Sequence, residues 1–74
     1  MLAGAHCLIG VIHHERGDVE EAVSALRRAV YLDSDSAEAH AVLGHVLLKR
    51  GEGRRGRKHV ETAARLLAGR AESS

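Results

Sequence analysis

The chain has 74 residues, and its 11 Lys and Arg side chains nearly balance its 10 Asp and Glu side chains, for a net charge of +1. A chain this short forms at most one small domain and buries only about 60% of its unfolded surface. Its single cysteine, Cys7, excludes an intramolecular disulfide, and its longest uncharged run, residues 1–12, is too short to span a bilayer and lacks the basic start of a signal peptide. These features predict a cytoplasmic protein without a membrane segment.

The charges are distributed unevenly along the chain. Residues 1–48 contain 7 acidic and 3 basic side chains, whereas residues 49–74 contain 8 basic and 3 acidic ones. An acidic half and a basic half can attract each other head to tail, or the basic half can meet an acidic partner.

Residues 3–16 are predicted to form the first helix. Gly10 interrupts it, and a glycine inside a helix costs roughly 1 kcal/mol relative to alanine. A corresponding glycine, Gly44, interrupts the third predicted helix, so we interpret both glycines as points where a neighbouring helix comes close. The apolar face of the first helix consists of Leu8, Ile9, Val11 and Ile12.

A Gly17-Asp18 turn separates the first helix from a second one over residues 19–32. Gly17 can adopt the left-handed conformation that ends a helix. Asp18 is then expected to cap the second helix, with Glu21 completing a capping box. The buried stripe of this helix, spaced by four and three residues, is Ala22, Leu26 and Ala29.

The second half of the chain has the same organisation. A polar linker over residues 33–36 contains two competing helix caps, Asp35 with Glu38 as a capping box, and Ser36. The elements predicted after it are a helix over 37–50, a turn over 51–53, a helix over 54–68 that ends at Gly69, and a flexible tail over 69–74. The apolar positions of the last helix are Val60, Ala63, Ala64, Leu66 and Leu67.

The two halves are related by a repeat of 34 positions, in which His6, Ile9, Gly10, Gly17 and Ala29 correspond to His40, Leu43, Gly44, Gly51 and Ala63. Over residues 3–68 the chain resembles the tetratricopeptide repeat family, which has helix-turn-helix repeats of this length. The resemblance implies an all-α fold of four antiparallel helices, with one repeat over 3–33 and another over 36–68.

The chain departs from the family pattern at several positions. The usual Trp of the first helix is His6 in repeat one and His40 in repeat two, and we expect both rings to pack as wall residues. The usual Ala at the helix crossing is Gly56 in repeat two. Because Gly53 and Gly56 both weaken the start of the last helix, repeat two is expected to be the less stable one.

The family resemblance also implies where a partner binds. In this family the first helix of each repeat lines a concave groove that holds an extended or helical peptide, and the corresponding positions here are Cys7, Val11, His14, Glu15, Ala41, His45, Leu48 and Lys49. Members that bind chaperone tails use Lys, Asn and Arg in this groove, whereas the positions here hold Cys7, Val11, Ala41 and His45. An apolar peptide or helix of a partner protein is therefore expected, not a peptide carboxylate.

A narrower resemblance concerns two segments, R-R-A-V-Y-L-D-S-D from Arg27 and A-H-A-V-L-G-H-V-L-L from Ala39. They are similar to repeats appended to bacterial chemotaxis-receptor methyltransferases. This resemblance implies a regulatory or docking module of bacterial signalling that carries no methyltransferase chemistry.

No catalytic, metal or cofactor site is predicted. The segment G-E-G-R-R-G over 51–56 has the spacing of a dinucleotide motif, but that motif works between a strand and a helix. His13-His14-Glu15 lacks the spacing that places two metal ligands on one helical face. Cys7 lies on an apolar helical face, where cysteine usually behaves as a small hydrophobic residue.

The basic cluster over residues 49–58 is interpreted first as a solvated turn and second as a surface for an acidic protein. It has no interleaved aromatic residue for base stacking, so nucleic acid is not expected as a partner.

No polar capping helix follows the second repeat, although solenoids usually need one and generally contain at least three repeats. The sequence therefore predicts an uncovered apolar stripe and a homodimer formed through it. The residues expected in this self-association surface are Val60, Ala64 and Leu67. Self-assembly without any peptide ligand is the alternative function.

Overall fold

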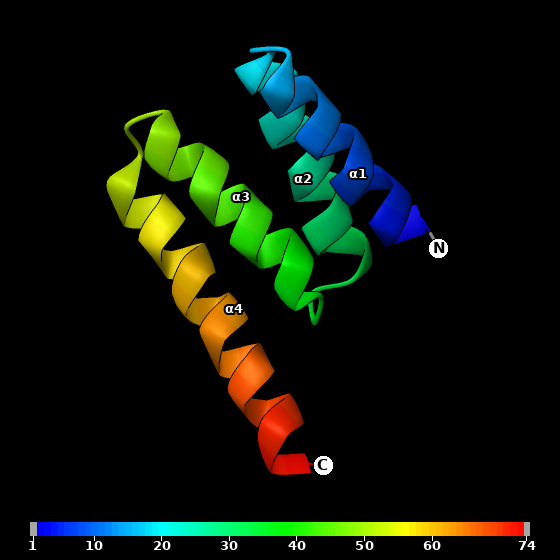
Figure 1. The fold of residues 1–74 in the computed structure, drawn as a ribbon, viewed down its shortest axis with the longest axis vertical. Coiled ribbons are helices and arrows are strands. Elements are labelled where there is room, and N and C mark those ends of the chain that lie inside the picture. Colours follow the sequence, from blue (N-terminus) through cyan, green and yellow to red (C-terminus); the bar gives the residue numbers. More distant parts are fainter. Residues whose placement is uncertain (1, 74) are drawn as a thin grey trace.

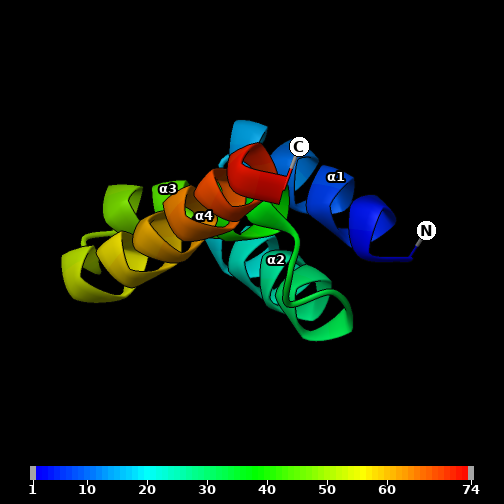
Figure 2. The same ribbon diagram turned by 90° about the horizontal axis from the view of Figure 1, so that it is seen from below.

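The computed structural model describes residues 2–73 and shows an all-α fold. Within this range the secondary structure consists of four helices, and no strand is present. The helices are α1 (Leu2–Glu15), α2 (Val19–Leu32), α3 (Ala37–Lys49) and α4 (Gly53–Ser73). They form two helical hairpins, α1 with α2 and α3 with α4 (Figure 1). The view from below shows the two hairpins side by side (Figure 2), with α2 and α3 joining them.

Both hairpins turn through a glycine in the left-handed conformation, as predicted for Gly17. The φ angles are 84° at Gly17 and 90° at Gly51. In the first turn the N–H of Gly17 donates to the carbonyl of His14 (3.1 Å), and the N–H of Asp18 donates to that of His13 (2.8 Å). The same pair of hydrogen bonds closes the second turn. These are Schellman motifs, which require a residue without a Cβ clash at positive φ.

The helix caps differ from the sequence prediction in one repeat. Asp18 precedes α2, but its side chain makes no capping hydrogen bond, so the capping box predicted with Glu21 is wrong. The Asp18 carboxylate instead lies 3.8 Å from Nδ1 of His13. At α3, Ser36 is the cap, and its hydroxyl accepts a hydrogen bond from the N–H of Ala39 at 3.1 Å. The shorter serine side chain therefore takes the position for which Asp35 competed.

The core lies where α2 meets α3. The stripe predicted on α2 is completely buried, since Ala22, Leu26 and Ala29 all have an exposed fraction of 0%. Ala22 and Leu26 of this stripe pack with Val23 against apolar residues of α3 in one cluster. The largest fully buried side chains are Leu26, Leu43, Leu47 and Val46. The spacing of apolar residues therefore identifies the buried stripe of α2 correctly. On α1 it does not, because Leu8, Ile9 and Ile12 of the predicted apolar face have exposed fractions of 62%, 43% and 43%.

Two glycines mark the closest helix approaches, as predicted. A Cβ atom added at Gly10 would lie 2.5 Å from Cγ of Leu26, so α1 approaches α2 at this point. In the second hairpin, a Cβ at Gly44 would lie 2.8 Å from the carbonyl oxygen of Gly56, and a Cβ at Gly56 would lie 2.8 Å from that of Gly44. The helices α3 and α4 therefore cross through a pair of facing glycines, which gives Gly56 a packing role beyond the weakening predicted for it.

The last helix does not end at Gly69, where the sequence analysis placed its end. It continues to Ser73 and projects beyond the rest of the bundle (Figure 1). Glycine ends a helix when it adopts a positive φ, and in the described residues only Gly17 and Gly51 do so. Arg70 lies on the continued part and pairs with Glu38 at the start of α3, with 3.3 Å between nitrogen and oxygen.

Candidate functional site

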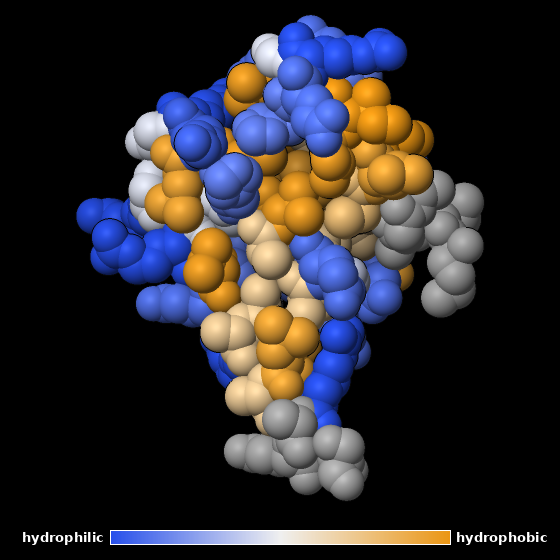
Figure 3. Space-filling view, viewed as in Figure 1, coloured by the Kyte–Doolittle hydropathy of each residue, from blue (hydrophilic) through white to orange (hydrophobic). Residues whose placement is uncertain are grey.

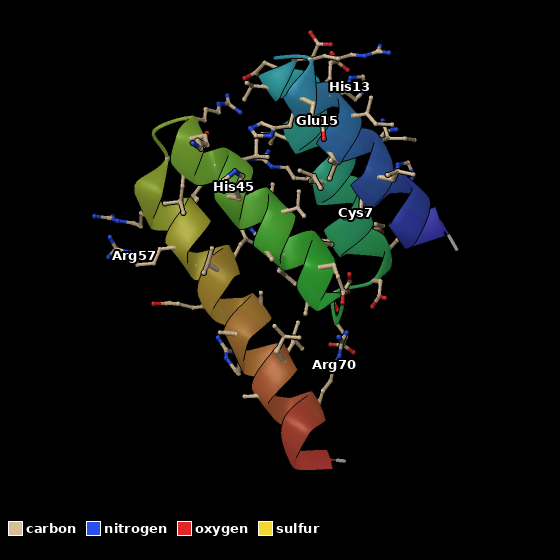
Figure 4. All side chains as sticks on the ribbon, in the orientation of Figure 1. Cys7, His13, Glu15, His45, Arg57 and Arg70 are labelled. Carbon is tan, nitrogen blue, oxygen red and sulfur yellow. The ribbon has the colours of Figure 1, made fainter. Side chains whose placement is uncertain are left out.

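A shallow groove of about 310 Å³ lies between α1 and α3, the first helices of the two repeats. On this face, apolar surface gathers between the two helices and hydrophilic surface borders it (Figure 3). Glu15 on α1 and His45 on α3 lie on the same side of the bundle (Figure 4). The residues that line the groove are Val11, His14, Glu15, Ala41, Val42 and His45. Five of them are among the eight groove residues predicted from the sequence.

Two histidines meet at this groove from different repeats. The rings of His14 and His45 are in edge-to-face contact, with centroids 5.6 Å apart and planes at 84°. Such a contact fixes the two rings relative to each other and joins α1 to α3 across the groove. Glu15 also lines the groove and forms no ion pair with any other residue between 2 and 73.

Three predicted groove residues do not line it. Cys7 is half-buried and packs against the core cluster. Leu48 lies close to Gly56 of α4, so its side chain faces the second hairpin. Lys49 is exposed outside the lining at the end of α3. Val42 also lines the groove, although the sequence prediction did not include it; its position three residues before His45, on the same helical face, is the signal that could have identified it.

The environment of Cys7 does not favour a thiolate. Burial raises the pKa of the Cys7 thiol, and the nearby Glu38 carboxylate raises it further. Nucleophilic cysteines are found where positive charge lowers the thiol pKa. The direction of this shift agrees with the interpretation of Cys7 as a packing residue.

A second pair of histidines lies between α3 and α4. His40, predicted as a wall residue, has an exposed fraction of 7%, and its Nδ1 is 3.0 Å from Nδ1 of His59. The two rings stack with centroids 5.3 Å apart. Nε2 of His40 lies 2.9 Å from the carbonyl oxygen of Ser34. The sequence analysis did not identify His59, because its pairing depends on the register of two helices that the sequence does not specify.

The partly buried pair of His40 and His59 predicts a loss of stability on acidification. Burial lowers the pKa of His59, and the charges of His40, Arg27 and Lys58 lower it further. His59 therefore binds a proton more readily in the unfolded chain than in the folded one. Its contribution to the free energy of unfolding is present above the ordinary histidine pKa of about 6.5 and is lost as the pH falls below it. We expect the thermal midpoint to fall between about pH 7 and pH 5, with the fall reduced in His59→Gln.

Circular dichroism melts at a series of pH values test this expectation. His14→Gln is the matched control, because His14 lies in the other histidine pair, and it should keep the wild-type pH dependence. Glu38 does not contribute to the fall in the thermal midpoint between about pH 7 and pH 5. A hydrogen bond from its own backbone and the contacts of Arg70 lower its pKa, so its effect lies at more acidic pH. If His59→Gln has the same pH dependence as the wild type, the fall in the thermal midpoint does not come from His59.

Ion pairs engage part of the predicted basic cluster. Arg50 pairs with Glu20 of α2 at 2.6 Å and with Glu52 at 3.1 Å, and Glu52 also contacts Arg55 at 3.6 Å. In each of these pairs at least one side chain is about one-third exposed or more, and surface pairs of this kind usually contribute less than about 1 kcal/mol. Arg50 nevertheless bridges the two hairpins, so the cluster is more than a solvated turn.

The structure also addresses the predicted absence of cofactor and membrane sites. Residues 51–56 form the turn between α3 and α4 and the start of α4, as a repeat turn requires. Among the side chains of residues 6–70, no group of three or more His, Cys, Asp or Glu is arranged to hold a metal ion. In the same range, no helix has both the length and the hydropathy needed to cross a membrane.

The predicted self-association residues lie on the exposed side of α4. Val60 has an exposed fraction of 40% and Leu67 one of 51%, and Ala64 between them is also exposed. These side chains form a partly exposed apolar stripe, although Val60 also lies against Gly44 of α3.

Comparison with known families gives a match between residues 10–51 and the TPR repeat. The match contains every residue that lines the groove between α1 and α3. No curated protein matches the chain, so the resemblance to the repeats of chemotaxis-receptor methyltransferases gains no support from this comparison. TPR repeats generally mediate protein–protein interactions, and the chain belongs to the tetratricopeptide repeat family.

Proposed function

We propose that the groove between α1 and α3 binds an apolar peptide or helix of a partner protein, and that the protein is a non-catalytic interaction module. The observation that carries the proposal is the lining of the groove, where Val11, Ala41 and Val42 provide apolar surface from both repeats. A surface of this kind accepts the apolar side chains of an amphipathic segment.

The charge of the groove narrows the chemistry of the partner. Glu15 is the charged residue in the lining, and it has no ion-pair partner within residues 2–73. A Lys or Arg beside the apolar residues of the partner would pair with it. The occupant we propose is therefore an apolar segment with a flanking basic residue, which differs from the acidic tails that other members of the family bind.

A displayed library of random peptides, selected against the purified protein, tests this proposal. Selected peptides should combine apolar residues with Lys or Arg, and Ala41→Lys should weaken their binding by about tenfold or more, equivalent to about 1.4 kcal/mol. Lysine at this exposed helical position fills the groove and repels the basic residue, yet it keeps helix propensity. Ala64→Lys makes the same change on α4 and should leave binding unchanged.

A signalling methyltransferase is the specific partner that the sequence suggests. The two segments beginning at Arg27 and Ala39 carry this part of the proposal, in which the repeats dock or regulate the enzyme in a bacterial chemotaxis system. The test is a binding measurement with a chemotaxis-receptor methyltransferase domain, in which Ala41→Lys should reduce binding.

Self-association through α4 is the alternative function, and the exposure of Val60 and Leu67 favours it. A two-fold dimer would cover this stripe with the same stripe of a second chain. The same pair of variants separates the two functions, because Ala64→Lys should shift the sedimentation equilibrium toward monomer and Ala41→Lys should not. A wild-type monomer at all concentrations would exclude the alternative and leave the groove proposal unaffected.

A further inference from the structure

A second hollow, of about 370 Å³, is bordered by residues of α2, α3 and α4. It shares no residue with the groove between α1 and α3. The lining contains three permanently positive side chains and a histidine pair, but no carboxylate. The residues that line it are Arg27, His40, Arg55, Lys58, His59 and Thr62.

The positive charges of this hollow are poorly compensated by the protein itself. Within residues 6–70, whose side chains the structure describes, Arg27 and Lys58 form no ion pair. Arg55 contacts Glu52 at 3.6 Å, but Glu52 also holds Arg50 at the shorter distance of 3.1 Å. A hollow lined by charges of one sign concentrates ions of the opposite sign. The arrangement is therefore suited to an anion.

The directions of the hydrogen bonds made by His40 and His59 determine which ring nitrogen can take up a proton when an anion binds. The carbonyl of Ser34 can only accept, so Nε2 of His40 must donate to it. In neutral His40, Nδ1 is then an acceptor, and Nδ1 of His59 must donate to it. This order leaves the lone pair of His59 on Nε2. His59 can therefore take up one proton at Nε2 without breaking either hydrogen bond.

We propose that this hollow binds a phosphate monoester, with Arg27, Arg55 and Lys58 each meeting one of its outer oxygens. A phosphate monoester has three such oxygens and a charge of about −1.5 to −2 at neutral pH, which matches three cations better than a planar carboxylate does. Arginine is well suited to this contact because its fork of N–H donors can pair with two phosphate oxygens.

Anion binding in the hollow should be linked to proton uptake by His59. The charged groups around this ring are Arg27 from α2, His40 from α3, and Arg55 and Lys58 from α4 itself. Of these, Glu52 contacts Arg55. The positive members of this set oppose a charge on His59. A bound anion offsets them, so it favours protonation at Nε2, and protonation in turn favours the anion.

The first experiment titrates inorganic phosphate into the protein at constant ionic strength and follows binding by calorimetry and by NMR. Saturable binding is expected, with the largest NMR shifts at the residues of the hollow. Lys58→Gln and Arg27→Gln should each weaken binding by about tenfold. Arg57→Gln is the matched control, because Arg57 lies on the same helix but points away from the bundle (Figure 4) and should leave the affinity unchanged.

A second experiment uses sulfate, whose own charge stays constant between pH 5 and pH 8. Sulfate should bind more tightly as the pH falls through this range, and His59→Gln should remove this dependence. Phosphoserine, free and within a peptide, distinguishes the two sources of the ligand: tighter binding of the peptide assigns a phosphorylated partner protein, and equal binding assigns a small phosphate compound. Either result supports the site.

Other outcomes would overturn the proposal. Phosphate binding that does not saturate, or that Arg57→Gln weakens as much as Lys58→Gln does, would mean that the positive charge acts only as a diffuse field. The thermal melt of each variant shows whether it is folded, and a neutral substitution at an exposed position should leave the fold intact. If the hollow does not bind phosphate, the proposal for the groove between α1 and α3 is unaffected, because Ala41→Lys tests the groove separately.

Discussion

Leu26→Ala should lower the free energy of unfolding by about 3–5 kcal/mol. Leu26 has an exposed fraction of 0%, belongs to the cluster that joins α2 to α3, and is also the side chain against which Gly10 of α1 packs. Its truncation would leave a cavity at the junction of three helices. A chain of 74 residues has a stability of roughly 4–11 kcal/mol at typical values per residue, so this one change removes a large part of it.

Urea denaturation followed by circular dichroism measures the effect. Leu32→Ala is the matched control, because Leu32 lies on the same helix but has an exposed fraction of 46%, and its truncation should cost less than about 1 kcal/mol. Similar losses in the two variants would mean that the junction of the hairpins is not the main source of stability. The core would then have to be sought elsewhere in the bundle.

The helices and the core could be predicted from the sequence because both depend on local spacing. Ala22, Leu26 and Ala29 lie on one helical face whatever the rest of the chain does. Gly17 likewise indicates a helix end because Asp18 follows it and a new helical spacing begins at Val19. Gly69 shows the limit of this reasoning: a glycine ends a helix only if its φ becomes positive, and the sequence does not fix that angle.

The candidate sites were less predictable because they depend on how helices face one another. The family resemblance located five residues of the groove, but only the packing of α1 on α3 shows that Val42 lines it while Leu48 faces α4. The anion hollow combines Arg27 and Lys58, which are far apart in the sequence and belong to different hairpins. No spacing rule relates such residues, so the sequence indicated the positive charge but not the place where it gathers.

Gly44→Ala should destabilise the second hairpin, although alanine is the better helix former. A Cβ at this position would lie 2.7 Å from Cγ2 of Val60, 2.8 Å from the carbonyl oxygen of Gly56 and 3.1 Å from the backbone nitrogen of Val60. Two of these atoms belong to the backbone of α4 and cannot rotate away, so the helix itself must move. Overpacking of this kind costs about 1–3 kcal/mol, which exceeds the gain of up to about 1 kcal/mol in helix propensity.

Gly69→Ala provides the control, because it makes the same substitution inside α4 at a position where the added Cβ meets no other helix within 4 Å. Only the propensity term acts there, so this variant should gain up to about 1 kcal/mol in the free energy of unfolding. The two substitutions should therefore shift the urea midpoint in opposite directions. A stabilising Gly44→Ala would mean that α3 and α4 do not cross through facing glycines. The helix crossing would then tolerate alanine at position 56, where the family usually has it. Gly56 would in that case only weaken the start of α4.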